Sequence, residues 1–321
     1  MPQPTFRSFL GIAKESVFGT PVAATAFIPV KSMKPKDKQD FLEDAGQRGS
    51  MVDSYNKIAG TLMSEYDFDG DVFPDTIGFP LAGVLGDVTT TGASAPYTHA
   101  MAVLNTGTGQ PPSYTLSDYY AITTRQYAGA KISEVGLKFS GDGLLTYSAK
   151  AVALGSATAS APTPSYTAVT PLAGWVGAVT IGGSSNLTLI DGECTIKRSV
   201  DAINTVDSTQ APYALWSGPV SVSGKLTLVM EDDTQLLNYL NNSQPALDIN
   251  YAQGAGASAV QVKLHMTKCA FTAADIERSK DYIALSVDYE AVANTTDVGG
   301  SGGYSPIKVT LQNALATGTY K

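Results

Sequence analysis

Few residues of this chain have the types and spacing that catalysis requires. Gly299-Gly300-Ser301-Gly302-Gly303 matches the glycine and serine positions of a nucleophile elbow, in which a histidine activates the serine. That motif stands between a strand and a helix, whereas here a strand pattern follows a glycine-rich run. Only two histidines, His99 and His265, exist in the sequence. We therefore expect no Ser-His-Asp triad and no enzymatic activity.

A second glycine-rich segment, from Gly254 to Ala259, resembles a dinucleotide-binding fingerprint. Pyrophosphate binding needs a helix N-terminus directly after the glycines, where backbone N–H groups point at the ligand. The residues that follow alternate between apolar and polar, as in a strand. We expect a hairpin loop here.

The candidate metal ligands also have unsuitable spacing. His265 and Cys269 would lie roughly 13 Å apart on a strand, whereas a shared ion needs bonds of about 2 Å. Asp67, Asp69 and Asp71 imitate the start of a calcium loop, but Val72 and Gly78 replace the glycine and glutamate that such a loop requires. We expect ordinary strand side chains at the first site, a solvated acidic turn at the second, and no cofactor.

The composition favours β-structure and argues against tight binding of nucleic acid. Of the 321 residues, 43% are hydrophobic and only 16% are charged, and the formal net charge is −8. Phosphate binding relies on clustered lysine and arginine, which this balance does not favour. Two cysteines make no disulfide framework, no secretory signal is evident and no apolar run reaches about 18 residues. We expect folding in a reducing cytoplasm, without membrane spanning.

Period-2 alternation predicts most of the elements that must position any functional side chain. It is clearest over 220–230, 260–266 and 283–289, and in a hairpin whose strands flank the turn Gly141-Asp142-Gly143. A short helix is predicted for Gln235 to Asn241, N-capped by Asp233 or Thr234, and a weaker one for Pro74 to Leu85. The fold class is therefore mainly β, with one short helix in each half.

The two halves show a similar order of features, which indicates a tandem duplication. Gly60-Thr61-Leu62 and Gly224-Lys225-Leu226 each precede an acidic residue and a short helix. The predicted organisation is a first β domain over 1–154 with an insertion at 87–112, a linker over 155–170, and a second β domain over 171–321. The final strand, 306–314, follows a flexible glycine-rich run. It either returns to the sheet of its own domain or adds to a sheet edge elsewhere in an assembly.

A charged segment over 31–57 has no apolar stripe, and segments of this length without a core are usually functional or disordered. In an oligomer it suits an arm that docks on a neighbouring subunit; the alternative is a solvated surface loop. The candidate arm residues are Lys34, Lys36, Lys38, Asp40, Glu43, Asp44 and Arg48.

The segment Gly11 to Ala24, GIAKESVFGTPVAA, continues into Phe27-Ile28-Pro29-Val30 and resembles the opening of tail tube proteins from long-tailed, siphovirus-like bacteriophages. The later order of charged arm, strand, short helix and hairpin is similar to that family as well. The resemblance implies tandem β-sandwich domains, each with a short flanking helix, and no catalytic residues. Their inner sheets would join those of neighbouring subunits in a β-barrel ring, and the arm would contact the adjacent ring.

The same resemblance implies a function and a set of partners. Rings of three or six subunits would stack in the virion tail, assembled in the host bacterial cytoplasm, as a conduit for DNA during genome ejection. The partners would be the tape-measure protein, the tail terminator and distal tail proteins, with transient passage of double-stranded DNA and no specific binding. We expect the following charged residues near the barrel, with the sign of the lumen charge left open: Lys131, Lys138, Lys150, Lys263, Asp288 and Glu290.

One alternative from another class stays open on the sequence. A two-domain β-sandwich binding module, of the carbohydrate-binding or adhesin type, would also be rich in tyrosine, acidic and without catalytic motifs. Formation of hollow rings would separate the two hypotheses.

Overall fold

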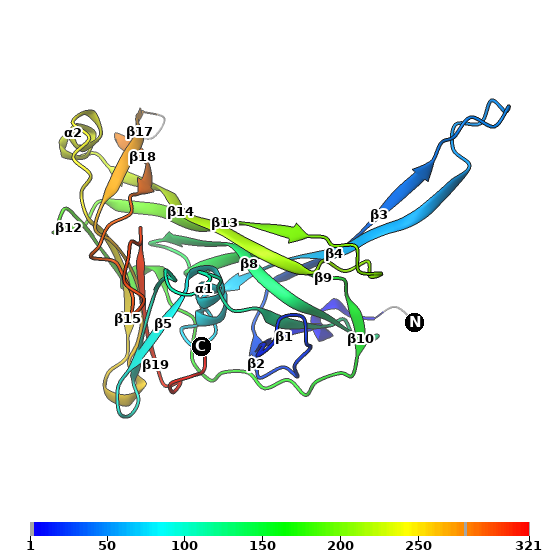
Figure 1. Cartoon of the computed structure of the whole chain (residues 1–321). Coiled ribbons are helices and arrows are strands. Elements are labelled where there is room, and N and C mark those ends of the chain that lie inside the picture. Colours follow the sequence, from blue (N-terminus) through cyan, green and yellow to red (C-terminus); the bar gives the residue numbers. More distant parts are fainter. Residues whose placement is uncertain (1–2, 279–280, 321) are drawn as a thin grey trace.

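A computed structural model describes residues 3–278 and 281–320, which form two antiparallel sheets and two short α-helices (Figure 1). The twelve-stranded sheet contains β1 (Phe9–Lys14), β2 (Ala26–Ile28), β3 (Ser32–Asp44), β4 (Asn56–Asp71), β7 (Tyr114–Tyr119), β8 (Thr124–Ser140), β9 (Thr146–Leu154), β10 (Ala157–Ala159), β13 (Leu189–Ile203), β14 (Ala214–Val229), β17 (Cys269–Glu277) and β18 (Ala284–Ala291). The seven-stranded sheet contains β5 (Gly86–Thr91), β6 (Tyr97–Val103), β11 (Gly177–Ile181), β12 (Ser184–Asn186), β15 (Leu247–Gln253), β16 (Val260–Met266) and β19 (Lys308–Asn313). The helices are α1 (Gly78–Leu85) and α2 (Thr234–Leu240), with 3-10 turns η1 (Thr5–Arg7), η2 (Gly174–Val176) and η3 (Gly256–Ser258).

The core lies between the two sheets. Leu137 and Phe139 of β8 face Ile249 and Tyr251 of β15 and Val262 of β16 across a small apolar void. The rings of Phe139 and Tyr251 lie 6.4 Å apart. Because successive side chains of a strand point to opposite faces, burial of these residues leaves the other face of the large sheet to polar side chains.

Most of the predicted elements are confirmed. The hairpin around residues 141–143 is β8–β9, and the predicted strands are β14, β16 and β18. The helix α2 begins one residue earlier than expected, and its N-cap residue Asp233 makes no side-chain capping bond. The weaker helix is α1, and all eight of its residues are buried.

The acidic turn predicted for Asp67, Asp69 and Asp71 is wrong, because these residues lie within β4. They alternate with Tyr66 and Phe68, which are buried in the core. The period-2 apolar pattern therefore determines the local structure, and the calcium-like spacing of the carboxylates follows from the pleat of the strand.

Both sheets contain strands from both halves of the chain. The segment predicted as an insertion supplies most of β5 and all of β6, and the final strand, β19, lies between β16 and β6. The sequence left open whether the final strand pairs within its own chain or with another subunit. The structure shows pairing within this chain. The seven-stranded sheet joins the two halves through the pairing of β19 with β6. The division into two domains therefore stays a prediction.

The N-terminal segment is held on β7 and β8 by a buried carboxylate. Glu15 is 5% exposed and accepts hydrogen bonds from the backbone N–H groups of Gly19 (3.0 Å) and Gly129 (2.7 Å). It also accepts one from the hydroxyl of Ser113 and one from that of Thr115, each at 2.8 Å. Gly19 has a φ of +74°, which glycine adopts without strain. The glutamate and glycine of the GIAKESVFGTPVAA segment therefore form one turn.

Candidate assembly surface: a charged sheet face with two free edges

Eight strands of the large sheet follow one another in the order β3-β4-β9-β8-β13-β14-β18-β17. The order is that of two four-strand sets, each formed by a long hairpin, a short helix and a second hairpin. We call β3-β4-β9-β8 the first set and β13-β14-β18-β17 the second set. Pairing between β8 and β13 joins them, and we call this the internal joint.

Irregularities in the ladder occur at corresponding places in the two sets. Between β8 and β9 the register shifts after Ile132, and between β17 and β18 it shifts after Phe271. The β3–β4 ladder shifts after Gln39, and the β13–β14 ladder shifts after Arg198. Because β-bulges are specific features of a strand pair, matching bulges align the sets residue by residue. Gly60 then corresponds to Gly218, not to Gly224 as the sequence comparison predicted.

The solvent-facing side of the eight strands carries rows of charged side chains. Directly opposite residues of antiparallel strands share a face, so the register places Lys34, Asp67, Lys150 and Glu134 on this side. Across the internal joint and the second set it adds the following residues: Lys138, Glu193, Lys197, Lys225, Asp275, Glu277, Asp288 and Glu290. We call this surface the charged face.

Ion pairs connect neighbouring strands on the charged face. Lys150 Nζ lies 2.8 Å from Glu134 Oε1, and Lys197 Nζ lies 3.8 Å from Glu134 Oε2. Lys138 Nζ lies 3.4 Å from Glu193 Oε2 across the internal joint. Pairing with Glu134 raises the pKa of Lys150. Exposed pairs contribute little stability each, so their main effect here is to favour one register over others.

The predicted barrel residues fall into three environments. Lys138, Lys150, Asp288 and Glu290 lie on the charged face. Lys131 is buried, and its ammonium group donates a hydrogen bond to the carbonyl oxygen of Pro111. Lys263 lies on β16 of the other sheet, with Nζ 2.8 Å from Asp248 Oδ1. Whether any of them lines a barrel stays a prediction.

Two buried cations, Arg198 of β13 and Lys131 of β8, lie near the internal joint. Arg198 donates from Nε to Gly218 O at 2.9 Å and from Nη1 to Val84 O, near the end of α1, at 3.0 Å. Burial lowers the pKa of Arg198 to about 10. Burial, and then the charge of Arg198, lower the pKa of Lys131 to about 8, while Glu15 acts in the opposite direction. The hydrogen bond from Arg198 to Val84 O attaches β13 to α1 and so joins the second set to the first half of the chain.

The charged segment 31–57, predicted as an arm, forms β3, the connecting residues 45–55 and the start of β4. The β3–β4 hairpin projects from the body of the molecule (Figure 1). Lys34, Lys36 and Lys38 lie in the part of β3 nearest the body, and Lys38 pairs with Glu65. Nearer the tip, Asp40 accepts a hydrogen bond from Thr61, and Arg48 Nη2 lies 2.6 Å from Asp44 Oδ2. Glu43 is exposed.

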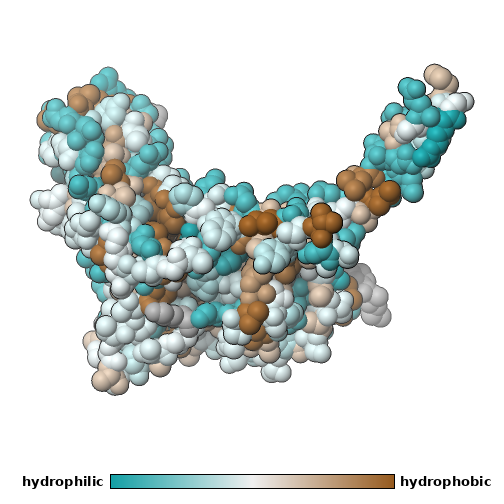
Figure 2. Space-filling view, in the orientation of Figure 1, coloured by the Kyte–Doolittle hydropathy of each residue, from teal (hydrophilic) through white to brown (hydrophobic). Residues whose placement is uncertain are grey.

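Apolar side chains are also exposed along this hairpin. Phe41, Leu42 and Ile58 are 63%, 61% and 55% exposed. Figure 2 shows hydrophobic residues on the projecting hairpin and a hollow between it and the opposite end of the molecule. A row of exposed apolar residues on a projecting element is typical of a protein contact.

The eight-strand run ends in a free edge on each side. Among the described residues, β3 pairs only with β4, and β17 pairs only with β18. The helix α2 lies against β17, as α1 lies against β8. Unlike α1, α2 buries none of its described residues, and its Leu237 and Leu240 are 42% and 64% exposed. Free edges with unpaired backbone groups are sites of association between chains.

The described residues provide no catalytic centre at the positions that the sequence singled out. His99 is buried and hydrogen-bonds Thr90 and Asn313, and His265 bonds Asp297 at 2.5 Å. Gly254 to Ala259 forms the loop between β15 and β16, as predicted. The loop at 299–303 is tied to β5, because the backbone N–H of Ser301 donates to Asp87 Oδ2 at 2.7 Å.

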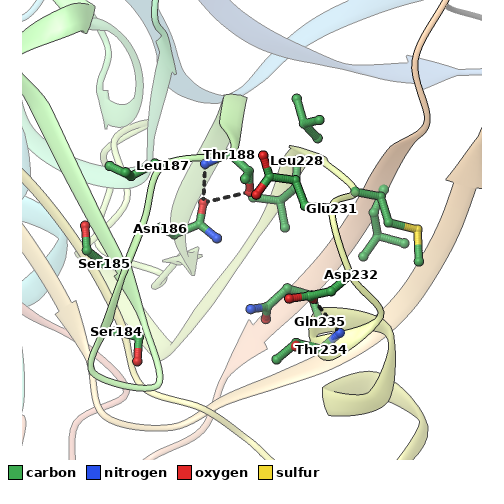
Figure 3. A pocket seen from close by; sticks show the side chains of 13 residues that line it. Ser184, Ser185, Asn186, Leu187, Thr188, Leu228, Glu231, Asp232, Thr234 and Gln235 are labelled. Carbon is green, nitrogen blue, oxygen red and sulfur yellow. Dashed lines mark hydrogen bonds between the residues drawn. The ribbon is translucent and has the colours of Figure 1, made fainter.

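A pocket lies between β12, the end of β14 and the start of α2 (Figure 3). Asn186 accepts hydrogen bonds from Thr188, and Asp232 accepts one from the backbone N–H of Thr234, so these polar groups stabilise their own turns. No group of three or more potential metal ligands occurs in the described residues. The helices in the same part of the chain lack the length and apolar character of a membrane span.

The family model described as phage tail tube protein matches residues 5–291. The chain belongs to the phage tail tube protein family. A comparison with curated proteins finds no match. The molecule is thus a structural, non-enzymatic component of the virion tail, and this assignment decides against the carbohydrate-binding or adhesin alternative.

Several charged residues of this tail tube protein belong to no sequence motif and were not predicted. Glu193, Lys197 and Lys225 lie on the charged face, and Asp275 and Glu277 lie on the free edge formed by β17. Their alternation with apolar residues was visible in the sequence. Their role depends on which strand follows which in the sheet, and that order comes from the fold.

Proposed function

We propose that three copies of this tail tube protein close into a ring by edge-to-edge addition of their eight-strand runs. The supporting observation is the repeated strand order, since two sets are already joined within one chain and a free edge remains on each side. If a ring holds six sets, as the family resemblance implies, three copies supply them. Ring closure would remove both free edges, which are an association hazard in the single chain.

The charged face would line the bore of the ring. Twenty-four strands at about 4.8 Å spacing and roughly 40° tilt enclose a cylinder roughly 45 to 50 Å wide between backbones, which admits a DNA duplex after allowance for side chains. Lysines on this face (Lys34, Lys36, Lys38, Lys138, Lys150, Lys197 and Lys225) are outnumbered by acidic residues (Glu65, Asp67, Asp69, Asp71, Glu134, Asp191, Glu193, Asp275, Glu277, Asp288 and Glu290). A net negative lining repels phosphates, so that DNA passes without being held.

The β3–β4 hairpin would connect successive rings. It projects beyond the body of the molecule and carries exposed Phe41, Leu42 and Ile58. Substitution of these three residues by serine should leave rings intact and prevent long tubes. The tape-measure protein would occupy the bore during assembly, and the terminator and distal tail proteins would cap the two ends.

Negative-stain electron microscopy of the purified protein at rising concentration tests the proposal. Three-fold symmetric rings or tubes with an open centre support it. Six-fold rings of six separate chains would refute the stoichiometry, since they would contain twelve sets. A protein that stays monomeric even with purified tail-initiation components would refute self-assembly.

A further inference from the structure

The internal joint shows how one set pairs with the next. In it Lys138 of β8 lies opposite Glu193 of β13, Gly136 lies opposite Thr195, and Glu134 lies opposite Lys197. The free edges β17 and β3 are the counterparts of β8 and β13 in the two sets. A joint between two copies of the chain would therefore bring β17 of one copy beside β3 of the next.

The bulges supply the register of that joint. They align Ile132 with Phe271 and Gln39 with Arg198, so Glu277 takes the position of Lys138 and Lys34 takes the position of Glu193. By the same alignment Asp275 takes the position of Gly136, and Lys36 that of Thr195. These equivalent positions follow from the backbone irregularities alone and are independent of charge.

This register brings opposite charges together. Glu277 would lie opposite Lys34, which repeats the Lys138–Glu193 pair of the internal joint with the two charges exchanged. Asp275 would lie opposite Lys36. Lys34, Lys36 and Asp275 are exposed, and none of these four side chains forms an ion pair with another described residue of its own chain. Cross-strand pairs of opposite charge are favourable, and like charges in these positions are unfavourable.

The exposed helix α2 supports the same placement. At the internal joint Arg198 of β13 reaches α1 and donates to Val84 O. The position of Arg198 is occupied in β3 by Gln39, and α2 lies against β17 as α1 lies against β8. A neighbouring β3 in this register would pass beside α2 and help to cover Leu237 and Leu240, which are exposed in the single chain.

We infer that β17 of one copy pairs antiparallel with β3 of the next in the register of the internal joint, with Glu277 opposite Lys34 and Asp275 opposite Lys36. This inference rests on the proposed ring and specifies its partner as a second copy of the same chain. The polarity is head to tail, because the two edges differ, and such a heterologous contact closes into a ring when its rotation permits.

Charge reversal and restoration test the pairing. Lys34→Glu with Lys36→Glu reverses β3, and Asp275→Lys with Glu277→Lys reverses β17. Each double variant should raise the protein concentration needed for rings about tenfold or more, and the quadruple variant should restore it to within about threefold of the parent. Lys14→Glu with Lys308→Glu, on strands β1 and β19 outside the eight-strand run, makes the same change of charge; it is the matched control and should assemble like the parent. Circular dichroism checks that every variant is folded.

A disulfide between copies tests the register independently. Directly opposite residues in antiparallel strands have Cα atoms about 4.5 to 5.5 Å apart, which a disulfide can bridge. Lys36→Cys with Asp275→Cys should cross-link assembled rings into covalent trimers under mild oxidation. Lys34→Cys with Asp275→Cys, displaced by two residues, should cross-link at least fivefold less. Native Cys194 and Cys269 are buried and free, so they are retained.

The two levels of the proposal fail differently. The register would be wrong if the parent forms rings but the quadruple variant does not regain ring assembly. It would also be wrong if the displaced cysteine pair cross-links more strongly than the directly opposite pair. Either result would leave the proposed ring unaffected. Absence of rings from the parent under all conditions would overturn the proposed function itself.

Discussion

Replacement of Glu15 by alanine should destabilise the folded chain by about 3 to 5 kcal/mol. The carboxylate is buried and accepts four hydrogen bonds, two of them from the backbone N–H groups of Gly19 and Gly129. A hydrogen bond to a charged group contributes about 1.5 to 3 kcal/mol, and a buried donor left without a partner costs about 1 to 3 kcal/mol. The expected cost is smaller than the sum of these four contributions, because the hydroxyls of Ser113 and Thr115 can rotate to other acceptors and water can enter the space.

Glu15→Gln separates geometry from charge. The amide keeps the size of the side chain and one acceptor oxygen, but its NH2 group faces two donors in place of an acceptor. We expect a cost of about 2 to 3 kcal/mol, smaller than that of alanine.

Thermal and urea unfolding of the unassembled protein provide the assay. Glu15→Ala should lower Tm by roughly 5 to 10 °C. Glu43→Ala, an acidic substitution on the exposed hairpin, is the control and should stay within about 0.5 kcal/mol of the parent. A Glu15→Ala protein as stable as the Glu43→Ala protein would show that this carboxylate does not hold the N-terminal segment.

Two further predictions concern the large sheet. Burial lowers the pKa of Lys131 to about 8, so the unfolded chain binds more protons between about pH 8 and 10.5, and this group's contribution to stability rises with pH over that window. Lys131→Met should therefore remove up to about 3 kcal/mol of that pH dependence, measured by urea unfolding at pH 7.5 and pH 10; an unchanged slope would contradict the assignment. Gly224→Ala should cost about 3 kcal/mol or more in thermal unfolding, because a Cβ there would lie 2.1 Å from Glu193 O and 2.5 Å from Tyr289 Oη. Gly141→Ala, where no atom lies within 4 Å, should be neutral, and equal effects of the two glycine substitutions would refute the steric argument.

The strands and helices of this protein could be predicted from the sequence because they depend on local patterns. Val260 to Met266 alternates over the full length of β16, and Gly141 to Gly143 supplies the turn between β8 and β9. The resemblance to the family also rested on local residues, those of the segment Gly11 to Ala24. Within that segment Glu15 accepts a hydrogen bond from the backbone N–H of Gly19, so both residues are needed for the same turn. The strand β4 shows where spacing alone misleads. Its carboxylates have the spacing of a calcium loop only because every second residue of a strand lies on the same face.

The arrangement of these elements could not be predicted, because it depends on contacts between residues far apart in the chain. The sequence alone determined a mainly β chain with repeated features, few catalytic groups and a charged segment over 31–57. Only the tertiary structure decided that β8 pairs with β13, that β19 lies between strands of both halves, and that Lys131 is buried while Lys138 is exposed. Alternation specifies which side chains share a face of a strand, and the neighbour of each strand is chosen by packing across the whole sheet.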